Sequence, residues 1–386
     1  MEHLIHAPIH DIQISGIRKI ATAAARYPDA LALTLGQPDF PTPEHIVIAA
    51  DQAMRQGKTV YTPNAGIPAL RRAAANFVKT KYGQHYDMDT EVIVTVGASQ
   101  ALDVALRTIV SPGDEVILPG PIYPGYEPLI RLAGGVPTYV DTRSTGFQLT
   151  AELLEPHLSP RTKAIALGYP SNPTGRVLGE QELTSIANLL REREIFIISD
   201  EIYSELIYDE PHRSISLLPG MREKTIVING LSKSHAMTGW RIGFTFAPAW
   251  LSAHMLKVHQ YNVSCASSIS QFAAVEALTN GIDDALPMRD AYRQRRDYVY
   301  DRLVQMGLEL DKPEGAFYLF PSIAHLNLSS MEFAMRLLEE EKVAVVPGDA
   351  FSVYGEGYIR LSYAYALPVL EQALDRLETF IRKLDM

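Results

Sequence analysis

Seven short apolar segments recur between residues 91 and 246, and they predict the strands of one sheet. Several are apolar without alternation, which is typical of strands buried on both faces. Helical patterns such as QALDVALRTIV and QELTSIANLLRER lie between many of them and favour β-α-β units, hence a mostly parallel sheet flanked by helices. The seven segments are EVIVTV (91–96), EVILP (115–119), VPTYV (136–140), KAIALG (163–168), IFIIS (195–199), TIVIN (225–229) and IGFTF (242–246).

The hydrophobic pattern changes near residue 287. A long charged helix is predicted over 287–307, then short strands within GAFYLFP, VAVVPG and GYIRLSYA, and a closing amphipathic helix over 367–384. We therefore predict an α/β fold with two domains. A large domain with a seven-stranded sheet takes residues 46–289, and a smaller α+β domain combines residues 1–45 with 290–386.

Composition and charge narrow the functional classes. The net charge is −10 at pH 7, so no basic surface for nucleic acid is expected. No run of about twenty apolar residues predicts a membrane span, and the N-terminal segment does not resemble a signal peptide. The single cysteine, Cys265, excludes an internal disulfide, and no metal-ligand spacing surrounds it. We expect a cytoplasmic protein without a metal site.

The segment NGLSKSHAMTGWRIGF (229–244) carries the first candidate chemistry. It sets Lys233 between two serines and adds Arg241. A lysine can form a Schiff base with a carbonyl, and Ser232 and Arg241 can bind an anion, the arginine bidentately. An aldehyde and a phosphate on one ligand describe pyridoxal phosphate, although SKS taken alone is more typical of a lysine in a solvated loop.

Strand ends provide the next candidates. Ser99 follows a predicted strand where a helix begins, so the segment either binds phosphate through free backbone N–H groups or merely caps the helix. Asp200 ends a buried strand, at the edge of an α/β sheet where ligands bind. Its carboxylate can keep a pyridine nitrogen protonated, with Tyr203 near the ring hydroxyl, or it can cap a helix.

Three further segments carry candidate binding residues. Asn172, in YPSNPTG, either hydrogen-bonds the ring oxygen or forms a turn before proline. Tyr123, between prolines and glycines, offers a fixed aromatic face or ordinary loop packing. Arg360, in an apolar strand pattern, suits an α-carboxylate or lies on an exposed edge.

Taken together and in this order, these segments resemble the class I/II aminotransferases of pyridoxal-phosphate fold type I. The resemblance covers nearly the whole chain. It implies transfer of an amino group between an L-amino acid and a 2-oxo acid, 2-oxoglutarate by family habit, in a ping-pong mechanism. Similar proteins are linked to N-acetyl-L,L-diaminopimelate and lysine synthesis. The motifs are LTLGQPDFPTP, YTPNAGIPALR, VGASQ, SPGDEVILPGPIYPGYEP, YPSNPTG, SDEIY, LSKSHAMTGWRIG, GAFY and IRLSYA.

The resemblance also implies residue roles. The catalytic residues would be Lys233, which binds the cofactor's aldehyde and then acts as general base, with Asp200 at the pyridine nitrogen and Tyr203 at the ring hydroxyl. Tyr61 would reach the neighbouring subunit's phosphate in a homodimer. The remaining contacts to the cofactor would be made at the phosphate by Ala98, Ser99, Ser232 and Arg241, and at the ring by Tyr123 and Asn172. The substrate would be contacted by Gly36, Asn172 and Arg360.

Departures from the family pattern bear on the substrate. Many aspartate enzymes carry GGK and a tryptophan where this chain has Ala98–Ser99 and Tyr123, and no arginine can be assigned to a side-chain carboxylate. We therefore expect longer donors, with Arg18 as one basic contact.

Two alternatives to an aminotransferase remain. One is other chemistry on this scaffold, such as β-elimination from a cysteine S-conjugate. The other is a cofactor-binding regulator, which would need a basic helix-turn-helix extension.

Overall fold

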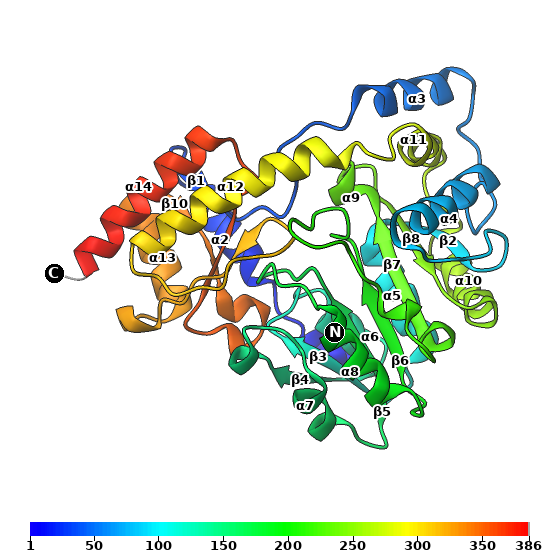
Figure 1. The fold of residues 1–386 in the computed structure, drawn as a ribbon, viewed down its shortest axis with the longest axis horizontal. Helices are drawn as coiled ribbons and strands as arrows, with labels where there is room; N and C mark the ends of the chain where they lie inside the picture. Colours follow the sequence, from blue (N-terminus) through cyan, green and yellow to red (C-terminus); the bar gives the residue numbers. More distant parts are fainter. Residues whose placement is uncertain (385–386) are drawn as a thin grey trace.

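A seven-stranded sheet organises the larger part of the molecule in the computed structural model, which describes residues 1–384 (Figure 1). The strand order is β2-β8-β7-β6-β5-β3-β4, and β8 alone runs antiparallel to its two neighbours. The prediction of one mostly parallel sheet from seven apolar segments is confirmed. The strands are β2 (Val92–Val96), β3 (Glu115–Gly120), β4 (Val136–Asp141), β5 (Thr162–Gly168), β6 (Phe196–Asp200), β7 (Thr225–Gly230) and β8 (Ile242–Phe246).

Helices cover both faces of this sheet, which explains why its strands are apolar at consecutive positions. Ile226 and Ile228 of β7 pack with the face covered by α5, α6 and α10, whereas Val227 packs with the opposite face, beside α4 and α11. All three side chains are fully buried. The helices of this part are α3 (Glu44–Arg55), α4 (Pro68–Tyr82), α5 (Gly97–Ile109), α6 (Tyr126–Leu132), α7 (Ala151–Leu154), α8 (Glu180–Leu190), α9 (Leu231–Ser234), α10 (Ala249–Val263) and α11 (Ser268–Thr279).

The smaller part combines an early segment with the C-terminal quarter of the chain. β1 (Leu31–Ala32) pairs in parallel with β10 (Val343–Ala344), and β11 (Val346–Pro347), β12 (Ile359–Ser362) and β9 (Tyr318–Leu319) form a second small sheet. Around them lie α2 (Gly16–Ala24), α12 (Ala285–Gln305), α13 (Ser330–Glu341) and α14 (Leu367–Leu384). Figure 1 shows α12 running from beside α11 to α14, so this helix links the two parts.

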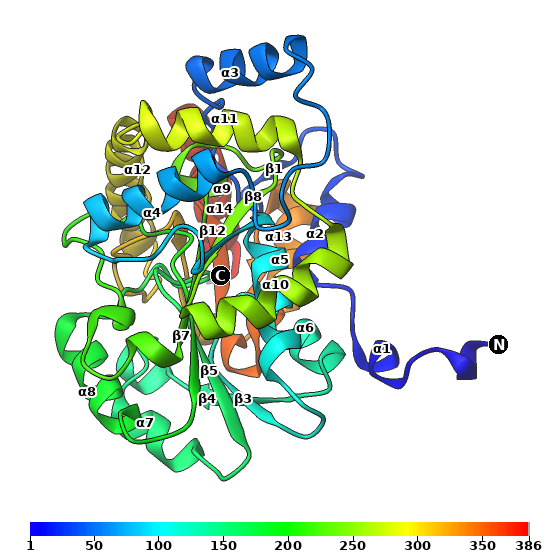
Figure 2. The same ribbon diagram turned by 90° about the vertical axis from the view of Figure 1, so that its right-hand side faces the viewer.

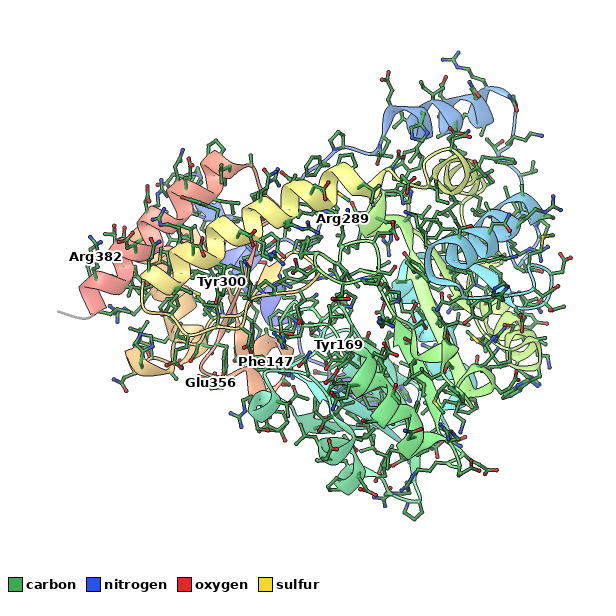
Figure 3. All side chains as sticks on the ribbon, in the orientation of Figure 1. Phe147, Tyr169, Arg289, Tyr300, Glu356 and Arg382 are labelled. Atoms are coloured by element: carbon green, nitrogen blue, oxygen red, sulfur yellow. The ribbon has the colours of Figure 1, made fainter. Side chains whose placement is uncertain are left out.

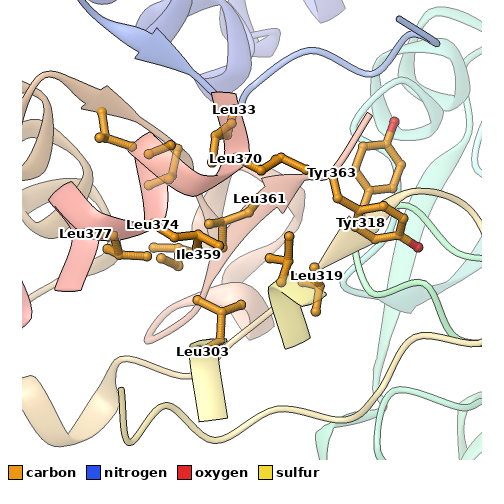
Figure 4. Close-up of a cluster of buried hydrophobic side chains, with 14 of the residues drawn as sticks. Leu33, Leu303, Tyr318, Leu319, Ile359, Leu361, Tyr363, Leu370, Leu374 and Leu377 are labelled. Carbon is orange, nitrogen blue, oxygen red and sulfur yellow. The ribbon is translucent and has the colours of Figure 1, made fainter. Parts of the chain in front are cut away.

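Apolar side chains from both ends of the chain build one buried cluster in this smaller part. Leu33 lies among Leu303, Leu361 and Leu370, although more than 260 positions separate it from each of them along the chain. Figure 4 shows Tyr318 and Tyr363 at the end of the cluster nearest the larger part. The cluster explains why a segment before residue 45 is needed to complete the smaller part. The boundaries at residues 45 and 290 stay a prediction.

Aromatic contacts also join the two parts. Phe147, labelled near their junction in Figure 3, packs edge-on against Phe320 and Tyr358, with ring centroids 5.5 and 5.2 Å apart. Its carbonyl accepts a 3.1 Å hydrogen bond from the hydroxyl of Tyr169. These contacts position the smaller part against the carboxyl ends of the strands.

Two segments project from this body. The short helix α1 (Ala7–Asp11) lies on an arm that leads away to the N-terminus at the right of Figure 2, and α3 stands apart at the top of the same view. Among residues 1–384, no helix combines the length and the apolar character that a membrane span requires.

Candidate active site

A cavity of about 670 Å³ opens where the carboxyl ends of β5, β6 and β7 meet the smaller part. This is the edge at which open α/β sheets bind ligands. The sequence-predicted residues that line it are Gly36, Ala98, Ser99, Tyr123, Asn172, Asp200, Tyr203, Ser232, Lys233, Arg241 and Arg360, with Arg18 beside them. Tyr61 does not line the cavity of its own chain and is 87% exposed.

Lys233 extends into the cavity from α9, directly after β7. Its Nζ donates a hydrogen bond to the carbonyl oxygen of Gly36. Burial, together with the nearby charges of Arg360 and Arg241, lowers the pKa of Lys233 to about 8. A lysine with a lowered pKa offers an uncharged amine near neutral pH, which is the form that acts as a nucleophile or a base.

Asp200 ends β6 at the floor of the cavity. Its Oδ2 accepts a 2.8 Å hydrogen bond from the Tyr126 hydroxyl, and its Oδ1 accepts a 3.2 Å hydrogen bond from the backbone N–H of Ile202. Burial raises the pKa of Asp200 to about 6, although both hydrogen bonds oppose that shift. A buried carboxylate of this kind favours a cationic group in front of it, because such a group compensates for lost hydration.

An anion site forms where α5 begins. The first N–H groups of a helix have no acceptor within the helix, so Ala98 and Ser99 present donors at the positive end of its dipole. Arg241, at positive φ just before β8, crosses Gly97 so closely that a Cβ at Gly97 would collide with the guanidinium. Gly243 allows β8 to approach this same turn. The arrangement suits a phosphate.

Arg360 lies on β12 and is 1% exposed. Its Nη2 donates to the Thr34 carbonyl at 2.6 Å and its Nη1 to Asn172 Oδ1 at 2.9 Å. The guanidinium lies over the ring of Tyr318, 4.4 Å from the centroid. Among residues 1–384, its Nε has no hydrogen-bond partner. A buried cation with unused donors at a cavity wall is suited to a carboxylate.

Two tyrosines belong to the site although the sequence reasoning gave them no role. Tyr126 holds Asp200, as described above, and it lies in the same PGPIYPGYEP loop that suggested Tyr123. The hydroxyl of Tyr318 shares a 2.8 Å hydrogen bond with the hydroxyl of Tyr203. A Cβ at Gly36 would collide with the Tyr318 hydroxyl. Tyr318 lies in the GAFY motif, so its position in the family pattern was the available signal.

These groups fit pyridoxal phosphate by their chemistry. Lys233 supplies an amine for the aldehyde, Asp200 an anion for the pyridine nitrogen, and Arg241 with the start of α5 a cationic site for the phosphate, all on one cavity. The structure offers no competing metal centre: residues 1–384 contain no group of three or more His, Cys, Asp or Glu side chains placed to hold a metal ion.

Fold and site together define the class of pyridoxal-phosphate-dependent transferases that act on amino acids. The family model for aminotransferase class I and II matches residues 28–377, most of the chain. This protein belongs to that family. It is a pyridoxal-phosphate-dependent aminotransferase, which moves an amino group between an amino acid and a 2-oxo acid.

Individual relatives agree with this assignment. A probable N-acetyl-LL-diaminopimelate aminotransferase of Bacillus subtilis is 60% identical over 383 residues, covering 99% of this chain and 97% of its own. An aspartate aminotransferase of Pyrococcus abyssi is 43% identical, with 96% of each chain covered. The crystal structure of Pyrococcus protein-A1 matches with a TM-score of 0.95 at 42% identity, covering 98% of this chain and 99% of its own.

Proposed function

We propose that this aminotransferase takes N-acetyl-L,L-diaminopimelate as amino donor and 2-oxoglutarate as acceptor, and that it serves lysine synthesis in the cytoplasm. The 60% identity to the Bacillus subtilis relative, over almost the full length of both chains, carries the choice of donor. The cavity wall supports it, because Ile14 and Leu35 expose 69% and 48% of their surface beside the cavity. Such a wall favours a donor with a long aliphatic chain.

Pyridoxal phosphate, when bound, supplies an aldehyde that takes up the amino group and a ring that accepts the electron pair of the substrate's Cα. In our proposal the uncharged Nζ of Lys233 takes the proton from Cα, since its lowered pKa makes it a base near pH 8. Asp200 holds a proton on the pyridine nitrogen by ion pairing. Tyr203 donates to the ring hydroxyl oxygen, and Tyr318 orients it through their shared hydrogen bond.

The remaining contacts orient the ligands. Tyr123 would pack on the ring face of the bound cofactor and Asn172 would donate to its ring oxygen, while the Asn172 Oδ1 accepts a hydrogen bond from Arg360. Arg360 binds the α-carboxylate in a bidentate manner, and Gly36, which lines the same cavity and lets the Tyr318 hydroxyl approach closely, contacts the substrate beside it. The phosphate is held by Ala98, Ser99, Ser232 and Arg241.

The donor assignment predicts a ranking of kcat/KM values. N-acetyl-L,L-diaminopimelate should exceed aspartate, aromatic amino acids and methionine by about tenfold or more, because only the long donor reaches the whole cavity. Steady-state rates with saturating 2-oxoglutarate measure this ranking. If aspartate leads by about a hundredfold, equivalent to roughly 2.7 kcal/mol of transition-state preference, the donor is wrong.

Arg360→Lys should lower kcat/KM about a hundredfold for every α-amino acid alike. Lysine replaces a planar fork with a point charge, so the hydrogen bonds to Thr34, Asn172 and the carboxylate cannot all form. The matched control is Arg161→Lys, whose side chain is 74% exposed and pairs with Glu115 at the surface. Losses that differ strongly between donors would assign Arg360 to the side chain of the donor instead.

We also propose a homodimer in which Tyr61 completes the site of the neighbouring subunit. Tyr61 lies outside its own cavity and, with Val60, it is largely exposed. Exposed apolar side chains also occur at Val47, Ile48 and Met54 of α3, the helix that stands apart from the body in Figure 2. Exposed apolar side chains on a projecting element of this kind favour a partner subunit.

Mixing two defective chains tests the proposed dimer. A hybrid of Tyr61→Phe and Lys233→Ala chains should carry both defects in one site and neither in the other. At limiting cofactor, each hybrid dimer should therefore show about half of the wild-type activity. The activity of the mixture should then exceed the sum of the activities of the two separate variants. Activity equal to that sum, or a fully active monomer in sedimentation, would refute the shared site.

A further inference from the structure

Four cationic side chains line the cavity, and only three have a role in the reaction. Arg241 faces the phosphate, Lys233 the aldehyde, and Arg360 the α-carboxylate in the proposed function. The single acidic side chain of the lining, Asp200, is matched to the pyridine nitrogen. Arg18 is therefore left as a positive charge on the cavity wall without a counterpart.

Arg18 lies in the first turn of α2, three positions after the N-cap Ser15. Its side chain is exposed, and residues 1–384 provide it with no hydrogen bond or ion pair. The Arg18 charge acts to lower the pKa of the Tyr123 hydroxyl, although burial raises that pKa overall, so Arg18 lies near enough to the cavity to interact with a charge inside it.

The part of the lining that carries Arg18 combines aliphatic side chains with the uncharged polar side chains of Gln13, Ser15 and Gln37. Ile14, Ile17 and Leu35 line the same cavity, and Ile14 and Leu35 are largely exposed to solvent. A buried arginine on β12 and an exposed arginine on α2 thus share one cavity with aliphatic side chains. This arrangement matches a molecule with two carboxylates joined by methylene groups.

We propose that Arg18 binds a second carboxylate at the far end of the amino donor, and so determines specificity for long α-amino dicarboxylates. The inference rests on the proposed function, because Arg360 must hold the α-carboxylate. It also explains the value of an N-acyl group on the far amine. Apart from Asp200, which is matched to the pyridine nitrogen, the lining provides no acid to pair with a free ammonium, and Arg18 would repel an ammonium at the far end, whereas an amide carries no charge.

A pair of donors that differ only at the far end tests the role of Arg18. 2-Aminopimelate ends in a carboxylate, and 2-aminoheptanoate of equal length ends in a methyl group. Arg18→Gln should lower kcat/KM for 2-aminopimelate about tenfold more than for 2-aminoheptanoate, the modest size reflecting solvent around Arg18. The matched control is Lys19→Gln, the next cation on α2, which lines an adjacent cavity with Asp349 and should leave the ratio unchanged.

Equilibrium binding gives a readout that does not depend on turnover. In calorimetry with the holoenzyme, heptanedioate should bind Arg18→Gln about tenfold more weakly than wild type, with a smaller change for heptanoate. Arg18→Lys should retain part of the preference for heptanedioate. Raising the salt concentration should reduce that preference in wild type and leave it unaffected in Arg18→Gln, because exposed charges are screened.

The outcomes separate this inference from the donor assignment. If N-acetyl-L,L-diaminopimelate is a poor donor but Arg18→Gln still selectively impairs 2-aminopimelate and heptanedioate, the donor is wrong and Arg18 keeps its role. If Arg18→Gln lowers kcat/KM equally for the two donors and affinity equally for the two carboxylic acids, or changes none of these values, the role of Arg18 is overturned, whatever the best donor is.

Discussion

Lys233→Ala should abolish amino transfer, with turnover reduced about 10⁴-fold or more, while the protein still binds pyridoxal phosphate noncovalently. The variant loses both the amine that attaches the cofactor and the base at Cα. The phosphate site at α5 and Arg241 and the carboxylate of Asp200 are unchanged, so affinity for the cofactor persists.

Covalent trapping measures the assignment of Lys233 directly. Borohydride treatment of wild type should fix the cofactor to the peptide that contains Lys233, and the alanine variant should take up no label. Lys257→Ala, which removes an exposed lysine of α10, is the matched control and should label normally. Label on a different lysine would rule out the assignment.

The pKa of about 8 at Lys233 predicts how the rate of covalent cofactor capture depends on pH. The shift is downward from 10.5, so the amine is already uncharged between pH 8 and 10.5, where an ordinary lysine is still protonated. Covalent capture of added cofactor by the cofactor-free protein should therefore accelerate about tenfold per pH unit below 8 and level off above it. Absorbance stopped-flow gives the rate, and continued acceleration up to pH 10 would mean that Lys233 is not desolvated.

Asp200→Ala should slow the removal of the Cα proton about 10³-fold and weaken cofactor binding far less. The carboxylate is a fixed negative charge aimed at the group that takes up electrons, and such electrostatic contributions are large in a buried site. Single-turnover conversion with deuterated and protiated donor measures this step. A near-normal rate in the variant would contradict the proposed ion pair.

The fold of an Asp200 variant is not expected to suffer. Burial raises the pKa of Asp200 to about 6, so at pH 8 the cofactor-free protein holds an unfavourable buried charge. Asp200→Asn removes that charge and leaves an oxygen to accept from Tyr126, so its thermal stability without cofactor should equal or exceed that of wild type. Asp301→Asn, at an exposed position of α12, controls for the loss of a surface charge.

Much of this site was predictable because each residue lies in a local pattern with its own physical meaning. Asp200 follows an apolar run, and the end of a buried strand in an α/β sheet is where ligands bind. Ser99 lies within the first turn of α5, as the pattern before it predicted. The family resemblance then indicated that these separate patterns serve one cofactor, which no single segment indicates.

The seven strands could be predicted from the amino-acid sequence, because most of them are buried on both faces and consecutive apolar residues record that burial, the edge strand β4 being the more exposed exception. That β8 runs antiparallel between β2 and β7 became apparent only in the folded chain, because strand direction depends on the path of the connections. The tertiary fold also sets which distant groups meet: Lys233 with the Gly36 carbonyl, 197 positions away, and Arg360 with Asn172. The shifted pKa values of Lys233 and Asp200 belong to the same category, because desolvation and charge depend on what packs around a side chain in space and leave no trace in its sequence neighbours.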